Sequence, residues 1–137
     1  MSGYKAHFLA GLIVTALAAI IAFNLNYLAF TPANLAWLFG ISFVFSLLPD
    51  ADIGTSLIRK VLLTAFIVYI LFSGIGIVGY ILGAIVIVIQ FLPHRGIMHT
   101  FVMGALLAGM LWFYFHNLAF PIIAFLNFIS HLVLDRM

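Results

Sequence analysis

Long runs of apolar residues, separated by short polar islands, make up most of the chain. A turn at Thr31-Pro32 places proline where a helix can start, and His116-Asn117 forms a second turn. About 20 apolar residues suffice for a helix to cross a bilayer. The pattern therefore predicts an all-α, polytopic membrane helix bundle. The clearest apolar runs are Phe8–Phe30, Leu35–Leu48, Phe101–Phe115 and Leu118–Leu134.

The tract Val61–Leu92 has two interpretations. As one helix it would be ~48 Å long, whereas the hydrocarbon core is ~30 Å thick. We therefore expect a break at Ser73-Gly74-Ile75-Gly76, which gives about six segments in all, with this tract forming two short or re-entrant helices. Gly74-x-Gly76-x-x-Gly79 nominally matches a dinucleotide-binding fingerprint. No strand or βαβ pattern surrounds it, so we interpret it as a helix break.

Composition narrows the class of protein. Of the 137 residues, 67% are hydrophobic and 6% are charged, whereas soluble domains carry about 25% charged residues. A soluble globular protein is therefore excluded, and the length predicts a single domain over residues 1–137.

The sequence also limits the partners and the processing of the chain. A net charge of +2 is too small for a nucleic-acid partner. With no cysteine, the chain has no disulfide-linked partner. Ala16-Leu17-Ala18 resembles a signal-peptide cleavage site, but the apolar run continues past it, so we expect no cleavage.

The charges supply a test of the six-segment arrangement. With six segments, every Lys, Arg and Asp lies on the side of the membrane that holds the N-terminus, whereas five segments would divide them between the two faces. By the positive-inside rule, that side is cytoplasmic. We therefore predict a multi-pass protein of the inner (plasma) membrane with both termini in the cytoplasm. The oligomeric state stays unknown.

The chemistry-bearing side chains gather in the polar islands on this same side. Neutral imidazole and carboxylate are the usual protein ligands of hard or borderline divalent metals. Ionisable groups at a membrane are expensive and are functional candidates by default. A bound cation would also keep neighbouring carboxylates ionised. The sequence therefore predicts one shared site for a divalent metal, with these candidate ligands: His7, Asp50, Asp52, His94, His99, His131 and Asp135.

Four motifs occur in an order that resembles a family of small bacterial and archaeal inner-membrane proteins, the LexA-regulated, membrane-bound metal-dependent hydrolases. The family is distantly similar to zinc-dependent phospholipase C. The resemblance implies a cofactor of one to three divalent ions, zinc or else manganese. Its motifs are Lys5-Ala6-His7-x-x-x-Gly11, Leu48-Pro49-Asp50-Ala51-Asp52, His94-Arg95-Gly96-Ile97-Met98-His99-Thr100 and Ser130-His131-Leu132-x-Leu134-Asp135.

The predicted activity is hydrolysis of a phosphoester, such as a lipid phosphate reached from the membrane lipids, at the cytoplasmic face. A metal-activated water would attack, Asp52 would take its proton, and Arg95 would clamp a phosphate oxygen through its planar fork. The alternative is a non-catalytic divalent-metal binder or transporter. Transporters usually hold the ion near the bilayer midplane, whereas these ligands lie at predicted helix ends.

Overall fold

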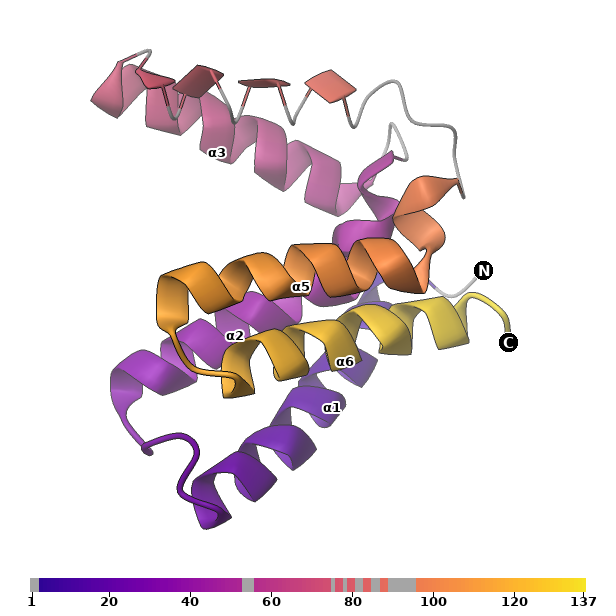
Figure 1. Cartoon of the computed structure of the whole chain (residues 1–137). Helices are drawn as coiled ribbons and strands as arrows, with labels where there is room; N and C mark the ends of the chain where they lie inside the picture. Colours follow the sequence, from indigo (N-terminus) through magenta and orange to yellow (C-terminus); the bar gives the residue numbers. More distant parts are fainter. Residues whose placement is uncertain are drawn as a thin grey trace.

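The structure is a computed structural model that describes residues 3–52, 56–74, 76–77, 79–80, 83–84, 87–88 and 96–137. Its described residues form helices and turns and no strand, so the predicted all-α class is confirmed. The helices, shown in Figure 1, are α1 (Tyr4–Asn24), α2 (Pro32–Leu47), η1 (Leu48–Asp52), α3 (Leu57–Ser73), η2 (Ile97–His99), α5 (Phe101–Phe115) and α6 (Ala119–Leu134); η1 and η2 are 3₁₀ helices.

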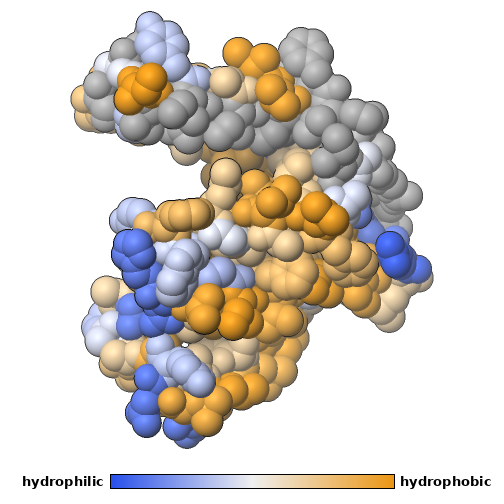
Figure 2. Space-filling model, viewed as in Figure 1, coloured by the Kyte–Doolittle hydropathy of each residue, from blue (hydrophilic) through white to orange (hydrophobic). Residues whose placement is uncertain are grey.

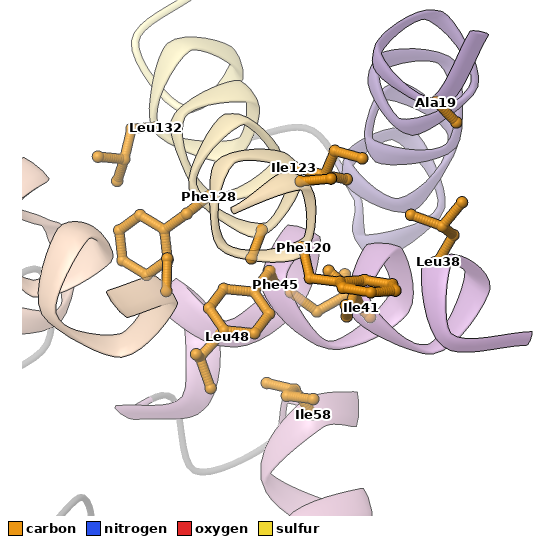
Figure 3. Packing of buried hydrophobic residues seen from close by; sticks show 14 of the residues in the cluster. Ala19, Leu38, Ile41, Phe45, Leu48, Ile58, Phe120, Ile123, Phe128 and Leu132 are labelled. Carbon is orange, nitrogen blue, oxygen red and sulfur yellow. The ribbon is translucent and has the colours of Figure 1, made fainter. Parts of the chain in front are cut away.

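Helix α6 is the centre of the bundle, because it packs against α1, α2 and α5 (Figure 1). Phe128 and Ile123 of α6 are fully buried, and Phe45 of α2 belongs to the same hydrophobic core (Figure 3). Gly104 allows α5 to approach closely, since a Cβ there would lie 2.5 Å from the Phe128 ring. The apolar character of α6 and its packing against three other helices are typical of a helix in a buried position.

Helix boundaries follow local signals. Thr31 caps α2 by accepting a hydrogen bond from the Asn34 backbone N–H at 3.2 Å, and Pro32 begins the helix as predicted. Helix α1 ends at Asn24, earlier than the apolar run that continues to Phe30. The reason is a turn in which Asn26 adopts a left-handed φ of 58°, a conformation that asparagine tolerates better than most residues.

The break predicted inside the tract Val61–Leu92 is present. Helix α3 ends at Ser73, and Gly74 has a φ of +68°, which favours glycine. A Cβ on Gly79 would contact Tyr69, and one on Gly83 would contact Phe66. These two contacts pair later residues with earlier ones, so the described residues after Gly74 run back antiparallel to α3.

The surface is largely apolar, as a bilayer requires. Figure 2 shows hydrophobic residues over much of the visible surface, with hydrophilic ones gathered toward the two ends of the bundle. The segments Tyr4–Asn24 and Pro32–Ala51 are long and apolar enough to cross a membrane, whereas Phe101–Phe115 and Ala119–Leu134 are shorter apolar helices. The 15 residues of α5 extend ~22 Å, less than the ~30 Å core. Six full crossings therefore stay a prediction.

Candidate metal centre

One end of the bundle brings together the polar islands of the sequence. Both chain termini, η1 and η2 lie at this end (Figure 1). The first turn of α1 supplies His7, η1 supplies Asp50, η2 supplies His99, and the last turn of α6 supplies His131, with Asp135 directly after it. His131 and Asp135 are four residues apart, so the helix places them on one face.

Four of these side chains each offer one donor atom to a common centre. The donor atoms of Asp50, His99, His131 and Asp135 all lie within 4.8 Å of one another. His131 Nε2 is 3.3 Å from Asp50 Oδ1 and 3.5 Å from Asp135 Oδ2. His99 Nε2 is 3.3 Å from Asp135 Oδ2 and 4.0 Å from Asp50 Oδ1.

These spacings fit a tetrahedral metal ion. Zinc binds nitrogen and oxygen ligands at about 2.0–2.2 Å, so neighbouring ligands of a tetrahedral ion are about 3.3–3.6 Å apart. Three of the four distances agree with that edge length, and the fourth, between His99 and Asp50, is wider. Because the donor atoms lie within 4.8 Å of one another, the set is somewhat wider than an occupied tetrahedral site.

A backbone group determines which ring nitrogen of His131 carries a proton. Its Nδ1 lies 2.7 Å from the carbonyl oxygen of Ser46, and a carbonyl can only accept a hydrogen bond, so Nδ1 carries the proton. In the neutral imidazole, Nε2 then points a lone pair toward the carboxylates of Asp50 and Asp135. Among the described residues, neither His131 Nε2 nor Asp135 Oδ2 has a hydrogen-bond partner, although both atoms are buried. A cation at this point would satisfy both atoms, and a histidine whose second nitrogen binds a carbonyl is typical of metal sites.

Mutual repulsion and the dipole of α6 both act against the two carboxylates of the centre. Two carboxylates within 4.8 Å repel on the order of 3 kcal/mol at an effective dielectric constant of about 20. Asp135 also caps the C-terminus of α6, where the helix dipole disfavours a negative charge by roughly 0.3–1 kcal/mol. Both costs become gains when a divalent cation is bound, so the residues present fit a metal ion.

His7 joins the cluster from α1. Its Nε2 is 3.4 Å from Asp135 Oδ1, the carboxylate oxygen opposite the one that faces His99 and His131. The His7 side chain is 1% exposed. It therefore lies against the outer oxygen of Asp135, beside the four-donor set.

A buried polar layer supports the site one turn deeper in the bundle. Asn127 donates from Nδ2 to Thr15 Oγ1 at 2.7 Å, and its Oδ1 accepts from Ser42 Oγ at 3.3 Å. Gly11 leaves room for this layer, because a Cβ there would lie 2.5 Å from Ser46 Cβ and 2.6 Å from Asn127 Oδ1. The layer fixes α1, α2 and α6 beneath the imidazole of His131.

The sequence interpretation missed this layer, although a signal for it exists. Polar or small residues recur every fourth position on three otherwise apolar segments, which puts each set on one helix face. The sets are His7, Gly11 and Thr15; Ser42, Ser46 and Asp50; and Asn127, His131 and Asp135. The Ser46 carbonyl has no such signal, because a backbone group is present at every residue.

The side chains of three predicted site residues are outside what the structure describes. His94 and Arg95 lie outside the described residues, and for Asp52 the structure describes the backbone, in η1, but not the side chain. Their predicted roles as ligand, phosphate clamp and proton acceptor stay predictions. His116, in contrast, caps α5 at the other end of the bundle, away from the metal centre.

An all-α bundle with an apolar surface, and with histidines and aspartates gathered at one end, defines a helical membrane protein with a candidate metal centre. More particularly, the chain belongs to the YdjM inner membrane protein family, whose model matches residues 1–137. This assignment agrees with the inner-membrane part of the resemblance. The family assignment says nothing about hydrolysis or about a similarity to phospholipase C. We found no match to the chain among curated proteins or solved structures.

Proposed function

We propose that this inner membrane protein is a metal-dependent hydrolase that cleaves a phosphoester at the cytoplasmic face. The observation that carries the proposal is His131, whose Nδ1 is held by the Ser46 carbonyl while its Nε2 faces two aspartates. Asp50, His99, His131 and Asp135 would hold one divalent ion, which would have to bind a water as a further ligand in order to act as a catalyst. Two nitrogen and two oxygen donors suit zinc, and manganese is the alternative.

The chain's own groups each have a part in the reaction. A bound divalent ion supplies Lewis acidity and lowers the pKa of water to about 7. Asp50 is the more exposed of the two carboxylates, at 17% against 9% for Asp135, and its Oδ1 lies 4.0 Å from His99 Nε2. The oxygen of Asp50 that does not bind the ion would accept the proton of the attacking water as a new P–O bond forms, and would return a proton to the leaving oxygen as the ester P–O bond breaks; Asp52 is the alternative that the sequence predicts for this role.

Metal content is the direct test. Protein purified in detergent, reconstituted with zinc and desalted, should hold zinc by elemental analysis, and Asp50→Asn and His131→Ala should both lose it. Asp50→Asn keeps the side-chain size, so its loss of metal would not reflect a cavity. His116→Asn is the matched control, because it removes a histidine from the opposite end of the bundle and retains a residue that tolerates the left-handed φ of 49°. A wild-type protein that is folded and holds neither zinc nor manganese would overturn the proposal.

Turnover separates the hydrolase from a metal binder or transporter. We expect metal-dependent release of product from p-nitrophenyl phosphate, bis(p-nitrophenyl) phosphate or phosphatidic acid in mixed micelles. Full zinc occupancy without turnover of any phosphoester would favour the non-catalytic alternative. That the donors lie at helix ends disfavours transport, because transport sites usually lie near the bilayer midplane.

The proposed orientation has its own test. The positively charged residues that the structure describes belong to segments at the end that holds the metal centre; they are Lys5, Arg59, Lys60 and Arg136. The positive-inside rule assigns this end to the cytoplasm. Tags at the two termini should both be inaccessible to a protease outside the cytoplasmic membrane. Opposite accessibility of the two tags would refute an even number of crossings.

A further inference from the structure

A small pocket opens beside the metal centre. It has a volume of about 220 Å³ and is lined by His99, Leu132, Asp135 and Arg136. Two of its lining residues, His99 and Asp135, are donors of the candidate centre. A molecule in this pocket therefore lies against the proposed metal ligands, and Arg136 is the cation that it meets there.

The position of Arg136 is set by its neighbours. Its backbone N–H bonds to the Val133 carbonyl at 3.1 Å, which ties it to the last turn of α6. Its guanidinium carbon lies 5.9 Å from the centre of the Phe101 ring, close enough for a cation–π contact. None of the ion pairs within the described part of the chain includes Arg136. The guanidinium is thus held at the pocket by a ring that leaves its N–H donors available.

The charges of the pocket favour an anion once a metal is present. A divalent ion would neutralise Asp50 and Asp135, and Arg136 would then add one positive charge. An arginine presents donors in a planar fork that matches the oxygens of a phosphate. Without the metal, the same two carboxylates would oppose an anion, so the metal and Arg136 act on it together.

We propose that Arg136 binds the phosphate of the substrate in this pocket, next to the metal. The inference rests on the proposed function and adds to it a residue to which the sequence motifs give no role. A lipid phosphate and a water-soluble phosphate ester share this chemistry. Arg136 holds the phosphorus centre against the metal ligands while the rest of the substrate extends out of the pocket.

The test is binding of inorganic phosphate to the full chain in detergent, measured by calorimetry with and without zinc. We expect Arg136→Gln to weaken phosphate binding to the zinc-loaded protein about tenfold or more, as for loss of a charged hydrogen-bond partner, with zinc content unchanged. Phe101→Leu should weaken it about two- to fivefold, because the guanidinium loses the ring that holds it. Lys60→Gln is the control for net charge, since it removes an exposed cation that does not line the pocket.

The outcomes separate this inference from the proposed function. Zinc-loaded Arg136→Gln that binds phosphate as tightly as the wild type overturns the role of Arg136 while the metal centre stands. A wild type that holds no metal overturns the proposed hydrolase. Phosphate binding to metal-free wild type and metal-free Arg136→Gln then still tests the arginine. In metal-free protein we expect weaker phosphate binding that is lost in Arg136→Gln. An equal loss in Lys60→Gln would show a general charge effect and overturn the specific contact.

Turnover distinguishes the two sources of phosphate. In Arg136→Gln we expect a higher KM, with a smaller change in kcat, for the substrate that the enzyme uses. A substrate preference for phosphatidic acid over p-nitrophenyl phosphate assigns the pocket to a lipid headgroup, and the reverse preference assigns it to a soluble ester. An unchanged KM for both substrates in Arg136→Gln contradicts the proposal.

Discussion

The imidazole of His7 lies flat against the imidazole of His131, with ring centres 3.9 Å apart and an angle of 18° between the ring planes. The two histidines come from the first turn of α1 and the last turn of α6. Stacking fixes the plane of each ring, while the Ser46 carbonyl fixes the rotation of His131 about its own axis. The His131 nitrogen that faces the aspartates is therefore oriented before any metal binds.

The stack gives His7 two separable roles, as a support for His131 and as a nitrogen donor beside Asp135. His7→Phe keeps a ring of similar size and loses the donor, whereas His7→Ala loses both. We expect both variants to lower zinc affinity about tenfold or more, measured by competition with a chelating dye. His7→Ala should also lower stability by about 2–4 kcal/mol through the cavity it leaves, and His7→Phe by less than about 1.5 kcal/mol. Wild-type zinc affinity in His7→Phe would limit His7 to the supporting role.

The polar layer at Asn127 predicts a loss of stability. Asn127→Leu keeps the volume but leaves the buried hydroxyl groups of Thr15 and Ser42 without their amide partner. Unsatisfied buried groups cost about 1–3 kcal/mol each, so thermal unfolding in detergent should occur at a clearly lower temperature. Asn24→Ala is the control, because its amide bonds the Ile20 carbonyl at an exposed site; its effect should stay within about 0.5 kcal/mol. Equal effects of the two substitutions would mean that the layer does not stabilise the bundle.

Much of the fold follows from the sequence because a bilayer restricts what an apolar run can do. Runs without charges become helices, since every backbone group must be paired within its own segment. Proline at position 32 and glycine at position 74 then mark a start and an end of helices correctly. The end of α1 at Asn24 is not predictable from apolarity alone, because residues 25–30 are mostly apolar and yet form a turn around Asn26.

The sequence also predicts that the site residues come together at one end of the bundle, but it does not predict the contacts that orient their side chains. An even number of segments returns each polar island to the same end, which accounts for His7, Asp50, His99 and Asp135 lying together. The atom that orients His131 is a backbone carbonyl, and only the packing of α2 against α6 brings it there. The same limit applies to helix contacts. Small residues four positions apart occur in α5 both at Ala105 and Gly109 and at Gly104 and Ala108, and only the packing shows that Gly104 and Ala108 are the buried pair.

That difference in register gives a test within one helix. A Cβ at Gly104 would meet the Phe128 ring at 2.5 Å, whereas a Cβ at Gly109 would have nothing within 4 Å. Gly104→Ala should therefore destabilise the bundle by about 1–3 kcal/mol through overpacking. Gly109→Ala should be neutral or stabilise it by up to about 1 kcal/mol, the difference in helix propensity. The measurement is thermal unfolding of the two variants in the same detergent, and the reverse order would contradict the packing of α5 on α6.

The dependence of zinc stabilisation on pH tests the nature of the centre itself. Zinc needs the imidazole nitrogens unprotonated, and an imidazole ordinarily has a pKa of about 6.5, so protons compete with the metal as the pH falls through that range. Saturating zinc should raise stability by about 2.7 kcal/mol at a hundredfold excess over its Kd, and this gain should shrink between about pH 8 and about pH 5.5. The measurement is the shift in unfolding temperature between zinc-loaded and chelator-treated protein at each pH.

The rival arrangement, a His131–Asp50 ion pair held by a proton, predicts the opposite trend. A protonated imidazolium gains from the carboxylate only below its folded-state pKa, so that pairing would strengthen the metal-free protein as the pH falls and would leave zinc without effect at any pH. Asp50→Asn separates the two further. It should abolish the zinc-dependent shift at about pH 8 if Asp50 is a ligand, whereas for the ion pair it should lower stability chiefly at acidic pH. His116→Asn should retain the zinc-dependent shift of the wild type, since His116 caps α5 through its backbone N–H at the far end of the bundle.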